Sequence, residues 1–520
     1  MSNNPTQLIF SPTILMTTCI CLSQMAHADS VSQVENKLIN EANQANIYND
    51  QQKTLQSAKQ DIDIQQSAQS LQQAAAATLI GDEQNINIDA SWSVEQIYAY
   101  LEKDPEAFEN LLLRSIASTD AASLAVLLPA YEKYPQKDQS VIDWGTALIA
   151  LQSGDTNKSV ELFRKINAAL PNIRLLRLQM ASALYQNKQI NAAKNELEKL
   201  LREDMPESER EALTSYLESI KRLDKWSYGL NVSFVRDNNL EDAPAVGTTI
   251  GNQFSSLTYT TPHESGTGLN YNLSADKKWS YDNKFFTSFS AGLGGTYYWD
   301  NKKYNDVYTS VNVGVGYQTA SGEIEIAPTL SHSWYGGGIS GNDDRLKSYT
   351  LSKGVRLSGS KWLSPNVMYQ HSTQFTDLSY KAPYKHNDGD IYSMTNGILY
   401  APNAKQYYGI YWNLSKKDGV RDANSYERSG VNLSWNNTWD KGFTTLATFG
   451  MASKKYDGIN FAGITRHNRE YNIGLSIWKR DFSIFKLTPR LNLSAKRVNS
   501  NYAFDEFSDA NATVVFSKTF

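Results

Sequence analysis

The chain has 520 residues, which exceeds the usual size of one domain and predicts at least two structural units. Its formal net charge of −4, with 20% charged residues, excludes a nucleic-acid binder that is recruited by bulk positive charge. No apolar run approaches the roughly 18–20 residues of a spanning helix, which excludes a helical membrane protein.

The first residues predict a secretory signal peptide over residues 1–28. An apolar stretch over residues 8–22 precedes a small-x-small signal at Ala26-His27-Ala28, so cleavage is expected between Ala28 and Asp29. The residues before this stretch include no Lys or Arg, which departs from the usual pattern. Both cysteines, Cys19 and Cys21, lie in this segment. The mature chain would therefore have no thiol for a disulfide, a metal or nucleophilic chemistry.

Residues 29–90 are rich in Gln, Ala, Asn and Lys, and predict a spacer that is either a loose helix or flexible. Residues 91–225 predict a helical domain. One segment matches the tetratricopeptide template, with small residues where helices touch and large apolar residues between them. Its residues are Ala147, Ala150, Gly154, Ser159, Phe163, Ile166 and Pro171.

A second copy of this repeat lies about 34 residues further on. It comprises Ala181, Leu184, Ala193, Leu197 and Leu200. Lys188 stands where the first copy has Gly154 at the turn between the two helices, which departs from the consensus. Such repeats usually form a concave groove that binds an extended peptide or a partner protein. A packed helical spacer without a ligand is the alternative.

The composition changes at Lys225–Trp226, because residues 226–520 hold 47 of the 59 aromatic residues and 27 of the 30 glycines. Residues 307–318 alternate between apolar and polar positions, which predicts a strand with one apolar face. Residues 485–496 repeat this alternation. Aromatic residues gather near the strand ends, as interfacial girdles do. Examples are Tyr297-Tyr298-Trp299, Trp334-Tyr335 and Trp478.

Short turns alternate with long polar loops along this half. The expected short turns are residues 281–284, 320–322, 402–405, 440–442 and 479–481, with a longer one at 359–365; the longest loop is 236–265. About fourteen strands of roughly ten residues fit, which predicts a transmembrane antiparallel β-barrel over residues 226–520. A soluble β-sandwich is the alternative. An even strand number puts both barrel ends on one side, so the helical domain is expected in the periplasm of a Gram-negative bacterium.

No catalytic, metal-binding or cofactor motif is present: the sequence lacks a Walker loop, His-Glu-x-x-His and Gly-x-Ser-x-Gly. The histidines after the signal peptide have no spacing that forces them together, so we expect polar surface or lumen residues. They are His263, His332, His371, His386 and His467. The acidic residues at Asp343-Asp344 and Asp388–Asp390 are expected in solvated turns. We therefore expect no enzyme and no cofactor.

The order of signal peptide, tetratricopeptide repeats and barrel resembles the Slam proteins, the surface lipoprotein assembly modulators. The first strand, residues 226–240, runs into Arg236-Asp237-Asn238-Asn239, and this junction is similar to the start of the barrel in that family. The resemblance covers roughly residues 95–520 and implies an outer-membrane translocon. Its clients would be surface lipoproteins or secreted haem-binding proteins. The terminal Phe520 resembles the signal read by the outer-membrane barrel assembly machinery.

A mechanism follows as a hypothesis. The helical groove would hold a client at the barrel mouth, and the lumen would pass a hydrated chain along a polar lining that includes Arg356, Lys486 and Arg490. A passive porin or polysaccharide-export channel is the chief rival. A surface adhesin that uses the long loops is a third class, although it leaves the repeats unexplained.

Overall fold

The computed structural model describes residues 64, 67, 68, 70–72 and 93–519, except positions 242, 252–255, 339–344, 404, 461 and 480. The expected signal peptide with Ala28, Asp29 and both cysteines lies outside the described residues, as do most of the spacer, Asp343-Asp344 and Phe520. None of the described helices is long and apolar enough to cross a membrane.

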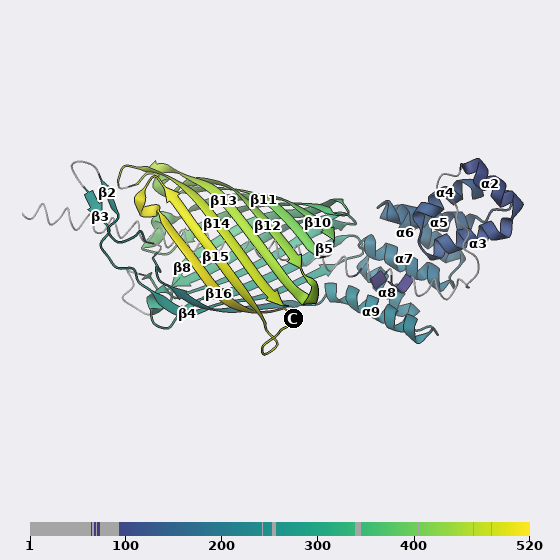
Figure 1. The fold of residues 1–520 in the computed structure, drawn as a ribbon, viewed down its shortest axis with the longest axis horizontal. Helices are drawn as coiled ribbons and strands as arrows, with labels where there is room; N and C mark the ends of the chain where they lie inside the picture. The colour runs from purple at the N-terminus through teal and green to yellow at the C-terminus, as the bar shows by residue number, and fades with distance from the viewer. Residues whose placement is uncertain are drawn as a thin grey trace, which may run out of the picture.

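A helical domain forms the first half of the described chain (Figure 1). Its helices are α2 (Val94–Lys103), α3 (Pro105–Ala117), α4 (Ala121–Tyr131), α5 (Gln139–Gln152), α6 (Thr156–Ala169), α7 (Arg174–Gln186), α8 (Ile190–Leu200) and α9 (Glu207–Leu223). Four consecutive helices, α3 to α6, begin after an aspartate whose carboxylate accepts a first-turn N–H. This capping explains where these helices start. By contrast, α8 has no side-chain cap of its own.

The two repeats have the same backbone geometry at the turns between their helices. Gly154 has a φ of 86° between α5 and α6, and Lys188 has a φ of 60° between α7 and α8. The second turn therefore keeps the left-handed conformation although it lacks the glycine. Ala147, Phe163, Ala181, Ala193 and Leu197 are fully buried in the core of the helical domain, whereas Gly154 and Pro171 are exposed at turns.

Six residues of the expected spacer are described, and they are helical. Ile64, Ala68 and Leu71 are spaced as one face of a helix. All three are buried within the same hydrophobic cluster as the helical domain. This part of the chain therefore contributes to the core of the domain.

The second half is a closed antiparallel barrel of 14 strands, in the order β1-β16-β15-β14-β13-β12-β11-β10-β9-β8-β7-β6-β5-β4 (Figure 1). The strands are β1 (Ser227–Asp237), β4 (Gly266–Ser280), β5 (Phe285–Tyr298), β6 (Asp306–Thr319), β7 (Gly322–Tyr335), β8 (Lys347–Ser364), β9 (Val367–Tyr380), β10 (Gly389–Asn403), β11 (Gln406–Gly419), β12 (Tyr426–Thr438), β13 (Phe443–Ile459), β14 (Thr465–Lys479), β15 (Thr488–Ser500) and β16 (Phe507–Thr519). The predicted fold of helical repeats followed by a barrel of about fourteen strands is confirmed.

The barrel has an apolar outer face and a more polar inner face. On β6, Val311, Val313 and Val315 point outward and are exposed, whereas Gln318 on the inner row is buried. An outer row of exposed large apolar side chains recurs on most strands. Because a closed sheet leaves few backbone groups unsatisfied, this arrangement is stable in lipid.

Most connections are short at the barrel end nearest the helical domain and longer at the other end, and the connection between β14 and β15 is the exception at the helical end (Figure 1). We call these the helical end and the loop end. The loop after β1 is the longest and carries the hairpin of β2 (Thr249–Gly251) and β3 (Ser256–Thr258). Short 3-10 turns occur in other loops: η1 (Lys302–Tyr304), η3 (Tyr384–Asn387), η4 (Asp422–Asn424) and η6 (Ala503–Asp505) at the loop end, and η5 (Asp440–Gly442) at the helical end.

Two connections differ from the prediction. The strand predicted from Phe485 begins only at Thr488, because Phe485 and Lys486 have φ values of 51° and 64°, which an extended strand does not accept. The turn expected at residues 359–365 is shorter, since β8 continues to Ser364.

Candidate functional site

The helical domain contacts the helical end of the barrel through the turn between β4 and β5. Asp282 in this turn accepts hydrogen bonds from the backbone N–H groups of Asn191 (3.1 Å) and Ala192 (3.2 Å). These groups belong to the first turn of α8, the helix without a cap of its own. The barrel therefore supplies the N-terminal cap of α8, where the helix dipole favours a negative charge.

Further polar contacts surround this cap. The Asn191 side-chain amide donates to the carbonyl of Ser280 (3.2 Å), and Lys284 donates to the side-chain oxygen of Asn157 in α6 (2.7 Å). Lys277 of β4 donates to the carbonyl of Asp224, the C-cap residue directly after α9. The helical repeats are thus held at the mouth of the barrel by contacts from three helices.

The inner wall carries a cluster of buried charges toward the loop end. Arg428 of β12 and Glu470 of β14 form an ion pair, in which the Arg428 Nη2 and Nε atoms lie 2.8 and 3.0 Å from Oε2 of Glu470. Lys454 of the intervening strand β13 is only 2% exposed, and its ammonium lies over the rings of Tyr426 (4.0 Å) and Tyr456 (4.9 Å). The ion pair and the aromatic faces compensate charges that would otherwise be costly to bury.

The three predicted lumen residues lie apart. Arg356 of β8 is on the inner row, and its Nη2 atom lies 3.9 Å from Oε1 of Glu325 of β7. Arg490 of β15 stacks on Trp478 of β14, with 4.6 Å between the guanidinium carbon and the ring centre. Lys486 lies in the turn before β15, at the helical end rather than along the wall. Trp478 therefore faces inward with Arg490 and is not an outward girdle residue.

The predicted barrel-start motif shapes the loop after β1. Asn239 N–H donates to the Asp237 carboxylate (2.9 Å), and the Asn239 side chain exchanges two hydrogen bonds with the backbone of Ala243. This turn brings Glu241 into a fully buried position, where it accepts hydrogen bonds from Glu264 N–H and from the Tyr304 hydroxyl (3.3 Å). Burial raises the pKa of Glu241. The motif thus folds the loop back over the barrel.

Tyrosines line the loop end from inside. Tyr298, Tyr304, Tyr335, Tyr349 and Tyr380 form one buried cluster. This cluster was not predicted from the sequence, and the prediction that Tyr298 and Tyr335 belong to an outer girdle is wrong. The strand period carried the signal: Tyr297 and Trp299 are exposed at 46% and 45%, so Tyr298 between them must face inward.

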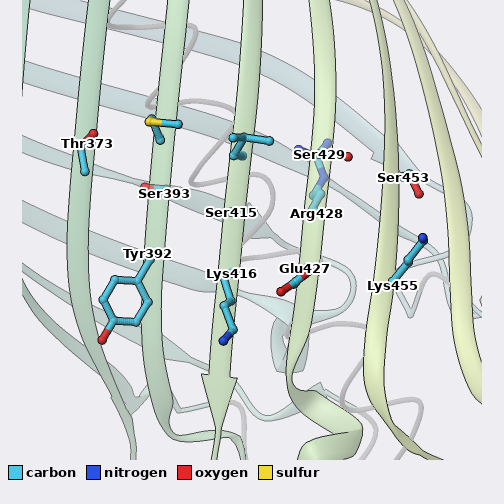
Figure 2. Close-up of a pocket in the computed structure, with 12 residues that line it drawn as sticks. Thr373, Tyr392, Ser393, Ser415, Lys416, Glu427, Arg428, Ser429, Ser453 and Lys455 are labelled. Carbon is cyan, nitrogen blue, oxygen red and sulfur yellow. The ribbon is translucent and has the colours of Figure 1, made fainter.

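The outer wall has a pocket of about 450 Å³ over β9 to β13 (Figure 2). Tyr392 and Leu414 of the exposed outer rows line it, so it opens toward the outside of the barrel and not into the lumen. Figure 2 shows Lys416, Glu427 and Lys455 on neighbouring strands at one side of the hollow.

The histidines lie in separate places. His263 bonds to the Pro244 carbonyl (2.8 Å), His332 to Ser348 (2.7 Å) and His467 to Ser453 (3.0 Å). His371 bonds to Asn396 and Thr373, and burial lowers the pKa of the loop residue His386. In the part of the chain that the structure describes, no three His, Cys, Asp or Glu side chains are grouped so that they could hold a metal ion.

Two family models match the two halves of the chain. The model described as Surface lipoprotein assembly modifier matches residues 226–520. The model described as Surface lipoprotein assembly modifier, N-terminal TPR repeats, matches residues 94–197.

Several relatives span most of the chain. "Surface lipoprotein assembly modifier" of Pasteurella multocida (strain Pm70) is 31% identical over 447 residues, covering 83% of this chain and 87% of that protein. "Surface lipoprotein assembly modifier 1" of Haemophilus influenzae (strain Rd) is 33% identical over 423 residues, covering 81% and 86%. "Hemophilin secretion modulator" of Acinetobacter baumannii is 21% identical over 431 residues, covering 78% and 85%.

These matches agree with the architecture. A helical repeat domain precedes a closed barrel with an apolar outer face, and the barrel and the family together indicate an outer-membrane protein. The names of the relatives refer to assembly and secretion rather than to catalysis. The chain belongs to the surface lipoprotein assembly modifier family.

Proposed function

We propose that this protein is a translocon that delivers client proteins across the outer membrane to the cell surface or the medium. The clients are surface lipoproteins or a secreted haem-binding protein, and the protein catalyses no reaction. The family and the relative named hemophilin secretion modulator support this proposal. Insertion by the outer-membrane barrel assembly machinery and contact of the outer rows with outer-membrane lipids are parts of the same proposal.

The observation that carries the proposal is the docking of the repeats at the barrel mouth. Asp282 caps α8, and Lys284 and Lys277 add contacts to α6 and to the end of α9. A client that is bound by the helical domain is therefore held beside the barrel at a high effective concentration. A porin with no cargo protein has no need for such a docked domain.

Deletion of residues 29–225, with the barrel retained, tests this function. We expect the truncated barrel to insert into the membrane and to keep its heat-dependent gel mobility. Client display, measured by protease accessibility on intact cells, should be lost. Display at the level of the full chain would refute the role of the helical domain.

The proposal also places the helical domain in the periplasm and the loop end outside the cell. Since no cysteine is expected in the mature chain, single cysteines report topology. Lys137 lies in the exposed α4–α5 connection, and Val420 is 70% exposed in a loop of the loop end. An impermeant maleimide should label Val420→Cys in intact cells, and Lys137→Cys only after the outer membrane is permeabilised. The opposite pattern would reverse the orientation.

A passive porin or a polysaccharide-export channel is the alternative function, because polar residues such as Arg356 and Arg490 lie on the inner wall. Steady ion conductance of the purified protein in planar bilayers, with normal client display after gene deletion, would favour the channel. Loss of display on deletion favours the translocon.

A further inference from the structure

The barrel closes between its first and last strands, and this seam is the most weakly paired. β1 pairs with β16 over five residue pairs, from Gly229↔Thr519 to Ser233↔Val515. The other flank of β1 pairs with β4 along all eleven residues of the strand. The other flank of β16 likewise pairs with β15 over eleven positions. Among the described residues, Phe234–Arg236 and Ser508–Val514 therefore have no strand partner across the seam.

The exposure of β16 agrees with this pairing. Five consecutive residues, Ser508 to Ala512, are exposed on both faces of the strand, whereas Ser517 in the paired part is buried. All five side chains are small or polar. A strand edge with unpaired N–H and C=O groups is a template for another strand. In a membrane these groups are costly to leave unsatisfied.

The weak stretch is bounded on both sides, so it is an internal gap and not a frayed strand end. The five-pair ladder closes the seam at the helical end. At the loop end, Ile250 of the β2–β3 hairpin packs in one cluster with Tyr502 and Phe504 of the loop before β16. The Tyr259 ring meets the Phe504 ring edge-on, with 6.4 Å between the ring centres. Figure 1 shows this hairpin at the end opposite the helical domain.

The seam also adjoins the domain that is proposed to hold the client. α9 ends at Leu223 and β1 begins at Ser227, so the last helix leads almost directly into the seam strand. At this junction Trp226 stacks on Tyr228 at the start of β1. A polypeptide held by the helical repeats is thus presented at the helical end of the seam, and the unpaired edge begins beyond the five-pair ladder.

We propose that the flank of β16 over Ser508–Val514, facing Phe234–Arg236 of β1, is a docking edge for a β-strand of the transported client. This inference depends on the proposed translocon function. The partner is an extended segment of about seven residues, which spans roughly 24 Å, close to the height of the apolar band of a barrel. It has apolar side chains beside Ala510 and Val514 on the outer face, and polar side chains beside Asp509 and Asn511 on the inner face. Main-chain hydrogen bonds give affinity, and this alternation selects the strand.

Photo-crosslinking tests the docking edge directly. p-Benzoylphenylalanine is placed at Ala510 on the unpaired flank or, as a matched control, at Phe516. Both residues lie on the outer row of β16, but Phe516 pairs with Val232 within the ladder. During export we expect a client adduct at least tenfold stronger at position 510 than at position 516. Equal adducts, adducts with a second copy of this chain, or no adduct at 510 while display continues would each overturn the proposal.

A disulfide lock gives a second, functional test. Val235 and Thr513 are the next inward-facing positions in the β1–β16 register, beyond the observed ladder. A disulfide between Val235→Cys and Thr513→Cys would hold the unpaired part of the seam closed. A disulfide between Asn231→Cys and Ser517→Cys cross-links a residue pair that is already in the ladder. We expect the first lock to reduce display at least tenfold, with recovery on reduction, and the control lock to leave display unchanged.

These results separate the seam from the translocon function. If display survives deletion of the whole gene, the proposed function fails. If display requires the gene but is the same in both oxidised locks, only the docking edge fails. Should the first disulfide not form, the crosslinking comparison of positions 510 and 516 still decides.

Discussion

Replacing Asp282 by alanine should loosen the helical domain from the barrel while leaving both parts folded. The Asp282 carboxylate satisfies two first-turn N–H groups of α8, at 3.1 and 3.2 Å, and α8 has no other side-chain cap. Loss of an N-cap costs about 1 kcal/mol, and loss of a charge at the helix dipole adds about 0.3–1 kcal/mol. Because the contact is exposed to solvent, we take a total near the lower end of this range, about 1.4 kcal/mol. This free energy corresponds to a tenfold shift of the equilibrium from the docked to the undocked helical domain.

Spin-label distances measure this shift. One label at Glu161 in α6 and one at Asn366 in the β8–β9 turn, both exposed, report the position of the domain relative to the barrel. The parent protein should give one narrow distance distribution. Asp282→Ala should add a broad component, and client display should fall with it. High salt should enlarge this component, because the contact is partly electrostatic.

Asp440→Ala is the matched control. Asp440 also lies in a turn at the helical end, but it pairs with Lys405 of the neighbouring turn (3.0 Å) and is 91% exposed. Its removal should leave the distance distribution narrow. If Asp282→Ala gives the same narrow distribution as Asp440→Ala, the capping contact does not hold the helical domain against the barrel.

Three further predictions concern the lumen, the long loop and the helical core. A Cβ at Gly397 would lie 2.4 Å from the buried Tyr411 ring, so Gly397→Val should destabilise the barrel by about 1–3 kcal/mol. The unfolding temperature of the variant on heat-modifiability gels should fall, and Tyr411→Ala should restore it. Burial raises the pKa of Glu241 above 4.5, so the Glu241 carboxyl holds its proton more tightly in the folded loop than in the unfolded loop. The stability of the folded loop should therefore fall as the pH rises from 4.5 through the raised pKa. Protease cleavage within residues 238–265 should then accelerate from pH 5 to pH 8 more than in Glu241→Gln; equal profiles would contradict this. Leu71→Ala should destabilise the helical domain by about 2–5 kcal/mol in denaturant unfolding, and Gln72→Ala should have little effect.

The fold was predictable because its signals are local. Strand period, turn length and the repeat spacing each act within a few dozen residues, and they correctly indicated a helical repeat domain and a barrel of about fourteen strands. Errors arose where two local signals compete. The run from Phe485 alternates like a strand, yet two residues with positive φ make its start a turn. Tyr298 lies in an aromatic triplet, but the strand period turns it inward.

The candidate site was less predictable because its contacts are not local. Asp282 caps a helix that begins about ninety residues earlier, and nothing in the turn sequence distinguishes it from any other turn aspartate. The Arg428–Glu470 ion pair needs the register of three strands before its partners can be named. The barrel-start motif was identified from a resemblance, and only the structure shows that Asn239 folds the loop so that Glu241 is buried.

The docking contacts and the weak seam lie on the two sides of β1. α9 is covalently joined to β1, and the capping aspartate Asp282 lies directly after β4, the strand that pairs with β1 along its whole length. The helical domain, β1 and β4 are therefore linked by a chain connection, by hydrogen bonds and by a complete ladder. The β1–β16 ladder has only five pairs. A client that pulls on the helical domain would therefore also pull on β1 and β4 together. Relative motion between strands is then expected first at the β1–β16 seam, because its ladder is the shortest.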